Sequence, residues 1–220
     1  RHLFKNKGQR GAIVRTVSTK HMLNHQAAAY GLPVVETPVG FKYVGEEMRI
    51  GDVMIGGEES GGVSIKGHIP EKDGILGDLL VIEMLAYEKK SLSEIWSELQ
   101  DEVGVRLFER RANFKVSSIE SARISEFLQS SPFSSLCGRK IERIDSRDGY
   151  KYYLSSDSWI LLRPSGTEPL IRLYAESNEP SLVVDMMQEF SNKLELFLAQ
   201  DETNSMLQSS CMESLSPVTS

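Results

Sequence analysis

The sequence predicts an α/β chain of two domains: a mainly parallel α/β/α sandwich domain over residues 1–104, followed by an α+β domain with an antiparallel sheet backed by helices over residues 105–199. Strand and helix patterns alternate in the first half, which is typical of a parallel sheet covered on both faces. Hairpin patterns dominate the second half. Thirteen of the 17 glycines lie at or before Gly77 and none follows Gly166, so loops that need close backbone approach belong mainly to the first domain.

The elements of the first domain follow from apolar runs and from residues that begin or end helices. In chain order, we expect a buried strand over 12–17, a helix over about 20–30, a short strand at 34–35, a turn-rich stretch around Pro38 and Gly40, a strand over 52–55, and helices over about 75–88 and 91–104. Ser18 or Thr19 is expected to cap the first helix, and Gly31 to end it. The helix over 75–88 is apolar around most of its circumference, which predicts that it is well buried.

The second domain is expected to begin with a strand over 105–116 and a helix over about 120–129. Strands over 140–144 and 150–154 flank an Asp148-Gly149 turn, which predicts a hairpin. Strands over 159–162 and 170–175 flank another loop. A helix then opens near Pro180, with an apolar stripe made of Val183, Met187, Phe190, Leu194 and Phe197. Residues 200–220 are rich in Ser and lack periodicity, which predicts a disordered tail.

Composition argues against several kinds of partner. The 25 Lys and Arg against 31 Asp and Glu give a net charge of −6 without a basic stripe, so we expect no nucleic-acid partner. The apolar run over 79–82 is far shorter than the ~20 residues that span a bilayer, so we expect no membrane partner. The only cysteines are Cys137 and Cys211, which form neither a disulfide framework nor a C-x-x-C zinc motif, and this favours the cytoplasm.

An acidic loop flanked by glycines follows the strand over 52–55: residues 57–62 read Gly-Glu-Glu-Ser-Gly-Gly. The carboxyl end of a strand is where open α/β sheets bind ligands. Glu58 and Ser60 would project to the same side of an extended loop, and a carboxylate beside a hydroxyl suits neighbouring sugar hydroxyls. The alternative is a tight turn with solvated acids. No G-x-G-x-x-G motif occurs, and His68 stands where a P-loop requires Lys.

A second candidate loop, residues 163–169, reads Arg-Pro-Ser-Gly-Thr-Glu-Pro and joins two apolar strands, with Arg172 on the second. Two hydroxyls, a glycine amide and two guanidinium groups could converge there on one phosphate, which Arg binds in bidentate fashion. The prolines at both ends lower the entropy of ordering the loop around an anion. The alternative is a hairpin whose arginines pair with acids.

Lys72 and the histidines carry weaker signals. Lys72 lies between Glu71 and Asp73, so it either forms a surface ion pair or reaches a substrate phosphate. His21 and His25 have the i, i+4 spacing of a metal pair. Because no Glu follows the first of them as in the metalloprotease pattern, we favour an exposed helix face. We predict no metal site in these residues.

Together and in this order, the acidic loop, the segment 68–74 around Lys72 and the loop 163–169 resemble the C-terminal half of the α-D-phosphohexomutase superfamily (phosphoglucomutase/phosphomannomutase), from about Gly11 to Tyr174. The resemblance implies that residues 1–104 match most of the third of four domains and residues 105–199 the fourth. It implies that the sugar is contacted by Glu58, Ser60, Gly40 and Phe41, and that Lys72 assists proton transfer or steadies the phosphoryl group. It also implies that the phosphate that is not reacting is held by Arg163, Ser165, Gly166, Thr167 and Arg172.

The implied reaction moves a phosphate between O1 and O6 of a hexose through a phosphoserine enzyme and a hexose 1,6-bisphosphate intermediate, with Mg²⁺ as cofactor. The family's phosphoserine loop, of the Thr-Ala-Ser-His-Asn-Pro type, and its Asp-Gly-Asp-x-Asp-Arg magnesium loop have no counterpart in these residues. With Arg1 as first residue, we expect a piece of a longer enzyme that needs its N-terminal domains and is inactive alone. The alternatives are a phosphoglucosamine mutase, whose sugar loop usually carries another residue between Glu and Ser, and a non-catalytic phosphosugar-binding module.

Overall fold

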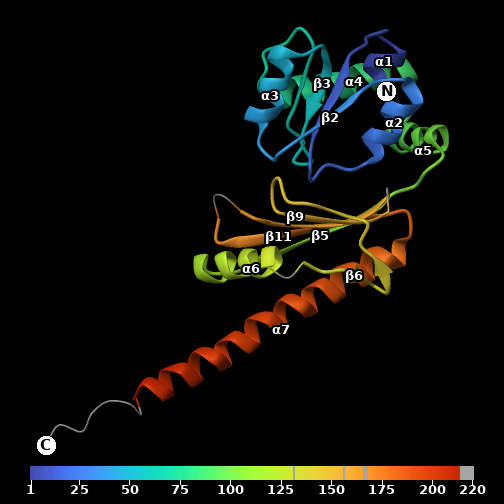
Figure 1. Cartoon of the computed structure of the whole chain (residues 1–220). Coiled ribbons are helices and arrows are strands. Elements are labelled where there is room, and N and C mark those ends of the chain that lie inside the picture. Colours follow the sequence, from blue (N-terminus) through green and yellow to red (C-terminus); the bar gives the residue numbers. More distant parts are fainter. Residues whose placement is uncertain (131, 156, 166–167, 214–220) are drawn as a thin grey trace, which may run out of the picture. The chain divides into compact units, whose positions relative to one another are not determined.

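The computed structural model describes residues 1–213 apart from 131, 156, 166 and 167, and for residues 200–213 it describes the backbone alone (Figure 1). The chain divides into two compact units, Arg1–Phe108 and Glu109–Ser220. The expected break after residue 104 lies shortly before this division. Each unit has a sheet and a hydrophobic core of its own.

Unit 1 contains a four-stranded sheet in the order β2-β1-β3-β4. Its strands are β1 (Ala12–Thr16), β2 (Val34–Thr37), β3 (Val53–Gly57) and β4 (Val63–Ile65). β1 runs parallel to β2 and β3, and β4 pairs antiparallel with β3. All of β1 is buried, as expected for a strand covered on both faces. The predicted mainly parallel sheet is confirmed.

Helices cover both faces of this sheet. They are α1 (His2–Lys5), α2 (Met22–Tyr30), α3 (Phe41–Ile50), α4 (Gly74–Glu88) and α5 (Leu92–Val103). Phe41 of α3 packs against Val14 on one face, while Leu3 of α1 and Ala27 of α2 pack against Ile13 on the other. Consecutive residues of a strand point to opposite faces, so Ile13 and Val14 tie β1 to both helical layers. The α/β/α architecture is confirmed.

α3 lies where only a turn-rich stretch was expected. Phe41, Val44 and Met48 recur at helical spacing and pack against the sheet. Gly45 in the middle of the helix weakens its propensity, which hides the pattern in the sequence. A Cβ at Gly45 would clash with the carbonyl oxygen of Pro70, so glycine is required by a close backbone approach rather than by a turn.

α4 contradicts the prediction that it is well buried. None of its 15 residues is buried, and Ile75, Leu79 and Ile82 are 75%, 58% and 61% exposed. The prediction rested on apolar residues around the whole circumference, but a sheet can contact only one side of a helix. Leu80 provides that contact, in the cluster around Ile13. The remaining apolar face of α4, defined here by Ile75, Leu79 and Ile82, is not covered by any residue that the structure describes.

Unit 2 contains a five-stranded sheet in the order β5-β11-β10-β9-β8 and a separate pair, β6 and β7. Its strands are β5 (Phe108–Lys115), β6 (Ser135–Leu136), β7 (Arg139–Lys140), β8 (Arg143–Asp145), β9 (Tyr150–Ser155), β10 (Ser158–Pro164) and β11 (Leu170–Ser177). β8, β9, β10 and β11 pair antiparallel in chain order, which confirms the predicted antiparallel sheet. The single strand expected over 140–144 is split into β7 and β8, which belong to different sheets, and the buried Ile141 between them joins the core.

Two helices, α6 (Ser118–Ser130) and α7 (Pro180–Glu213), pack against this sheet (Figure 1). Ile124 of α6, Phe190 of α7, and Tyr152 and Leu162 of the sheet belong to one cluster and are at most 1% exposed. The apolar stripe predicted over 183–197 lies within this cluster or packs against it. The helix-backed sheet is therefore confirmed.

α7 continues through Glu213, whereas a disordered tail was expected from residue 200. The segment between Ser181 and Glu213 contains no Gly or Pro and is rich in Gln, Glu, Met and Leu, which have high helix propensity. Missing apolar periodicity argues against packing, but it does not remove that propensity. Residues 214–220 lie outside the described residues.

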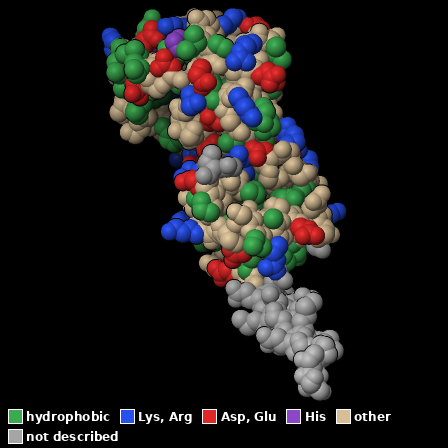
Figure 2. All heavy atoms as spheres, turned by 90° about the vertical axis from the view of Figure 1, so that its left-hand side faces the viewer, with side chains coloured by type: hydrophobic (Ala, Val, Ile, Leu, Met, Phe, Trp, Pro, Cys, Tyr) green, Lys and Arg blue, Asp and Glu red, His purple; other side chains and the backbone are tan. Residues whose placement is uncertain are grey.

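One face of the molecule can be compared with the charge balance of the sequence. On the face shown in Figure 2, Lys and Arg side chains are interspersed with Asp and Glu and do not gather into one basic stripe. Among the described residues, no helix combines the length and apolar composition that crossing a bilayer requires.

Cys137 gives a test of the packing of unit 2. It lies between β6 and β7 at a φ of 51°, and its backbone N–H donates to Glu189 Oε2 at 2.7 Å. Burial and the nearby Glu189 carboxylate raise the pKa of the Cys137 thiol to about 11. At about pH 8 we therefore expect iodoacetamide to alkylate Cys137 much more slowly in the folded chain than in urea, where the thiol pKa is about 8.5.

Mass spectrometry of tryptic peptides separates Cys137 from Cys211, and equal alkylation rates in the folded and unfolded chain would contradict the burial.

The raised pKa of the Cys137 thiol also makes the stability of the fold depend on pH. Because the folded state holds the thiol proton more tightly, the contribution of Cys137 to stability is complete below about pH 8.5 and falls as the pH rises towards 11.

Candidate functional site

The acidic loop joins β3 to β4 as a closed turn. The Glu58 N–H donates to the Gly62 carbonyl at 2.9 Å, and the Gly61 N–H donates to the Glu58 carbonyl at 3.1 Å. Gly61 has a φ of 92°, a conformation that favours glycine. The loop is thus tight rather than extended, and Ser60 is exposed at its tip.

The Glu58 side chain contacts another segment that was predicted to approach the same ligand. Its Oε1 accepts a hydrogen bond from the Gly40 N–H at 2.9 Å. Gly40 has a φ of 130° and directly precedes Phe41, the first residue of α3, which is 4% exposed. Two segments that are 18 residues apart, 40–41 and 58–60, therefore meet at the carboxyl end of the sheet.

Lys72 reaches the same place. Its Nζ lies 5.7 Å from the centroid of the Phe41 ring. A Cβ added at Gly62 would lie 3.4 Å from Lys72 Cβ and 3.5 Å from Glu58 Oε2, so glycine leaves room for both side chains. The Lys72 side chain is 57% exposed and its Nζ lies 3.1 Å from Glu71 Oε1. Exposed pairs of this kind are weak, so an anionic ligand can replace Glu71 as the partner of Lys72.

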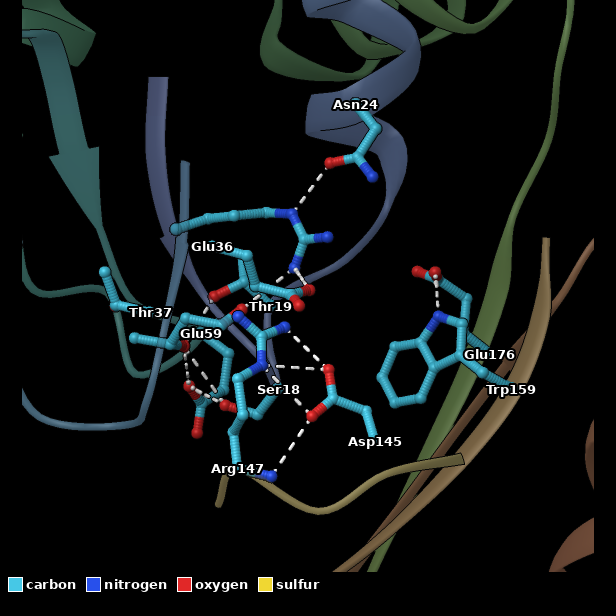
Figure 3. A network of polar contacts seen from close by, with 12 residues as sticks. Ser18, Thr19, Asn24, Glu36, Thr37, Glu59, Asp145, Arg147, Trp159 and Glu176 are labelled. Atoms are coloured by element: carbon cyan, nitrogen blue, oxygen red, sulfur yellow. Dashed lines mark hydrogen bonds and ion pairs between the residues drawn. The ribbon is translucent and has the colours of Figure 1, made fainter. Parts of the chain in front are cut away.

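Glu59 ties the acidic loop to the end of β1. Figure 3 shows Ser18 and Glu59 facing one another, and Ser18 Oγ donates to Glu59 Oε2 at 2.7 Å. Thr16 Oγ1 lies 3.2 Å from Ser18 Oγ and 2.8 Å from Thr19 Oγ1. The prediction that Ser18 or Thr19 caps α2 is wrong, because these hydroxyls bind their neighbours and Glu59 while the N-cap of α2 is His21, which makes no side-chain cap bond.

The predicted phosphate loop lies between β10 and β11. Arg163 and Arg172 are paired in register on these two strands, which brings both arginines to the same end of the hairpin. Ser165 begins the loop between them. Gly166 and Thr167, which were also predicted to bind phosphate, lie outside the described residues.

Each of the two arginines pairs with an acid. Both carboxylate oxygens of Asp148 lie 2.9 Å from Arg163 Nε, and Arg172 Nη2 lies 2.8 Å from Glu168 Oε2. The Glu168 N–H also donates to Ser165 Oγ at 3.3 Å. The hairpin with paired arginines is therefore present, and phosphate binding stays a prediction. From the sequence, Asp148 was interpreted only as a turn residue. The Asp148-Gly149 dipeptide indicated the turn, and nothing in the sequence indicated the contact with Arg163.

The described residues offer no metal centre. His21 is 5% exposed, so the exposed helix face favoured for the histidine pair is wrong for this residue, which lies before α2 rather than on it. Across the described part of the chain, no group of three or more His, Cys, Asp and Glu side chains is placed to hold a metal ion. The magnesium implied by the resemblance thus finds no ligand set among them.

Two family models match the chain. The phosphoglucomutase/phosphomannomutase alpha/beta/alpha domain III matches residues 1–103, and the phosphoglucomutase/phosphomannomutase C-terminal domain matches residues 114–193. The two matches follow one another along the chain as units 1 and 2 do.

Known proteins show the same similarity. A phosphoglucomutase/phosphomannomutase of Thermococcus kodakarensis is 30% identical over 76% of this chain and 34% of its own length. A phosphoglucosamine mutase of Carboxydothermus hydrogenoformans is 33% identical over 84% of this chain and 38% of its own length. A crystal structure assigned to a phosphomannomutase from Thermus thermophilus aligns with a TM-score of 0.69 and 33% identity, over 86% of this chain and 38% of that one. The chain spans little more than a third of each.

Proposed function

The chain belongs to the phosphoglucomutase/phosphomannomutase family, in which it corresponds to domain III and the C-terminal domain, and from this we propose that it carries the sugar-binding and distal-phosphate-binding loops of a phosphohexomutase. The proposed enzyme is an isomerase that interconverts hexose 1-phosphate and hexose 6-phosphate by intramolecular phosphoryl transfer. Its substrates would be glucose or mannose phosphates, and a hexose 1,6-bisphosphate would be both intermediate and activator. The free thiol of Cys137 supports a cytoplasmic location.

The observation that carries this proposal is the hydrogen bond between Gly40 and Glu58. Both residues were matched to sugar-contacting positions on separate motifs, and the bond of 2.9 Å joins those motifs at the carboxyl end of the sheet. Lys72 and Phe41 lie beside them. A carboxylate, a backbone turn and a cation at one place suit a phosphorylated sugar.

The two loops would bind different parts of the ligand. Glu58 and Ser60 would bind neighbouring hydroxyls, Gly40 and Phe41 would contact the sugar beside them, and Lys72 would help to move a proton or neutralise phosphoryl charge. The phosphate that is not reacting would be held by Arg163, Ser165, Gly166, Thr167 and Arg172. Phosphoryl transfer depends largely on positioning and charge neutralisation, which are the tasks these residues can perform.

Further domains are part of the proposal. Neither the phosphoserine motif nor the magnesium motif of the family occurs in these residues, and magnesium, when bound, would neutralise charge on the transferring phosphoryl group. We propose that domains like those preceding domain III in the relatives act with this chain. The exposed apolar face of α4 supports a further contact surface, because apolar patches on a protein surface commonly mark interaction sites.

Calorimetric titration of the 220-residue chain with glucose 1-phosphate tests the proposal. We expect binding without conversion to glucose 6-phosphate, even with glucose 1,6-bisphosphate and Mg²⁺ added. Glu58→Gln should weaken binding by about tenfold, because a charged hydrogen-bond acceptor is lost. Glu46→Gln, which removes an exposed carboxylate from α3, is the matched control and should bind like the wild type. Equal affinities for wild type and Glu58→Gln would contradict the assignment of the sugar loop.

There are two alternatives to this proposal. The similarity to the phosphoglucosamine mutase of Carboxydothermus hydrogenoformans favours an amino sugar substrate. Parallel titrations with glucose 1-phosphate, mannose 1-phosphate and glucosamine 1-phosphate distinguish the sugars by their affinities. A non-catalytic phosphosugar-binding module is the second alternative, and it would bind these ligands without converting them when the further domains are supplied.

A further inference from the structure

The turn between β8 and β9 lies directly against the strand that leads into the predicted phosphate loop. Gly149 in this turn has a φ of 85°. A Cβ added there would clash with the carbonyl oxygen of Leu162 and would lie 3.0 Å from the Cα of Arg163. The backbone of the turn therefore touches β10 at Arg163, an approach that glycine allows and other residues do not.

The residue before Gly149 holds the Arg163 side chain. Both oxygens of the Asp148 carboxylate lie 2.9 Å from Arg163 Nε, and the side chains of Asp148 and Arg163 are only 20% and 15% exposed. A guanidinium group has five N–H donors, and four of them are on Nη1 and Nη2. A phosphate that binds Nη1 and Nη2 does not use the Nε–H donor. The Asp148 carboxylate at Nε can therefore fix the Arg163 side chain without competing with that phosphate.

We propose that Asp148 is a positioning residue for phosphate binding: it fixes the Arg163 guanidinium so that Nη1 and Nη2 are presented to the phosphate of the ligand. This inference rests on the proposed function and adds a residue outside the loop motif. An arginine side chain loses rotamer freedom when it binds a ligand, and a partner that orders it beforehand reduces this loss. The partner is anchored in turn, because the Asp148-Gly149 backbone is packed against β10.

The other acid of the hairpin is placed to have the opposite effect. Glu168 contacts Arg172 at Nη2, a terminal nitrogen that a phosphate would need, at 2.8 Å. The Glu168 and Arg172 side chains are 53% and 27% exposed, so this pair is weaker than the Asp148 pair. Glu168 therefore competes with a phosphate for Arg172, whereas Asp148 leaves the terminal nitrogens of Arg163 available to a phosphate.

The opposite effects give a direct test by calorimetry of the 220-residue chain with glucose 1-phosphate. We expect Asp148→Asn to raise the dissociation constant by about three- to tenfold, and Glu168→Gln to leave it unchanged or lower it. Glu179→Gln removes the carboxylate partner of Arg139 elsewhere in unit 2 and serves as the matched control without effect. If Asp148→Asn leaves the dissociation constant unchanged, Asp148 does not position Arg163, and if it lowers the constant, Asp148 competes with the phosphate as Glu168 does; either result overturns the inference.

A double-mutant cycle separates positioning from a general effect on folding. In a chain that carries Arg163→Ala, Asp148→Asn should cause no further loss of affinity. An equal loss in both backgrounds would show that Asp148 does not act through Arg163. If Asp148→Asn does not fold, the Arg163 Nε–H resonance of the wild-type chain provides the second measurement. We expect slow exchange with water both before and after saturation with glucose 1-phosphate, and fast exchange in either state would overturn the inference.

Failure of the inference and failure of the proposed function give different results. A wild-type chain that does not bind glucose 1-phosphate contradicts the proposed function, and the inference with it. A wild-type chain that binds it, with an affinity that Asp148→Asn does not reduce, contradicts the role of Asp148 alone.

Discussion

Replacing Arg163 by alanine is expected to weaken the binding of glucose 1-phosphate to the chain by about tenfold to a hundredfold. Hydrogen bonds to charged groups contribute about 1.5–3 kcal/mol each, and Arg163 is predicted to contact the phosphate directly. The substitution also leaves the Asp148 carboxylate, which is 20% exposed, without the guanidinium that it contacts. Loss of a cation and exposure of an anion act in the same direction, so the effect should exceed that of any other single change in the loop.

Isothermal titration calorimetry measures this change directly. Arg139→Ala is the control, because it removes the same charge from an exposed arginine of unit 2 that pairs with Glu179. We expect the control to alter the affinity by less than about twofold, since exposed charges at a distance are screened. If both variants lose the same affinity, the arginines attract phosphate only through net charge, and the assignment of Arg163 fails.

Gly149→Ala is expected to destabilise unit 2 by about 2–4 kcal/mol. The substitution forces an L-residue into a φ of 85° and drives its Cβ into the carbonyl oxygen of Leu162. The turn cannot move away without losing the contact between Asp148 and Arg163. We therefore expect phosphate affinity and stability to fall together in this variant.

Urea unfolding followed by the fluorescence of Trp159, which is 2% exposed in unit 2, measures the free energy of unfolding. Trp96→Phe in every variant removes the other tryptophan. Gly138→Ala is the matched control: Gly138 has a φ of 68°, but a Cβ there would meet nothing within 4 Å. We expect the control to cost only about 1–2 kcal/mol from the left-handed conformation. A Gly149→Ala variant as stable as the control would show that the turn is not packed as described.

Much of the fold could be predicted from periodicity alone. β1 begins with the apolar run Ala12-Ile13-Val14 because both faces of the strand are covered, and the stripe of α7 recurs at helical spacing because one side faces the core. α3 could not be predicted in this way, since Gly45 interrupts its pattern for a tertiary reason, the carbonyl of Pro70. The exposure of α4 was missed because apolar residues show what a helix could bury, not what covers it.

Some residues of the candidate site could likewise be predicted from the sequence, and others could not. Glu58, Gly40 and Lys72 stand in recognisable motifs, so their convergence could be expected before the structure was known. Glu59 and Asp148 could not be assigned, because their roles depend on partners far away in the sequence. Glu59 bonds to Ser18 41 residues earlier, and Asp148 contacts Arg163 15 residues later. Only the folded arrangement of strands brings these pairs together.

The most direct measurement is an NMR titration of the ¹⁵N-labelled chain with glucose 1-phosphate, in which the backbone amides of both loops are followed at once. If one hexose phosphate contacts both loops, the amides of Gly40 and Gly61 and those of Ser165 and Arg172 will shift along a single binding curve with one dissociation constant. If only one pair responds, or if the two pairs saturate at different ligand concentrations, the loops do not share a ligand and the binding roles proposed for these residues are wrong.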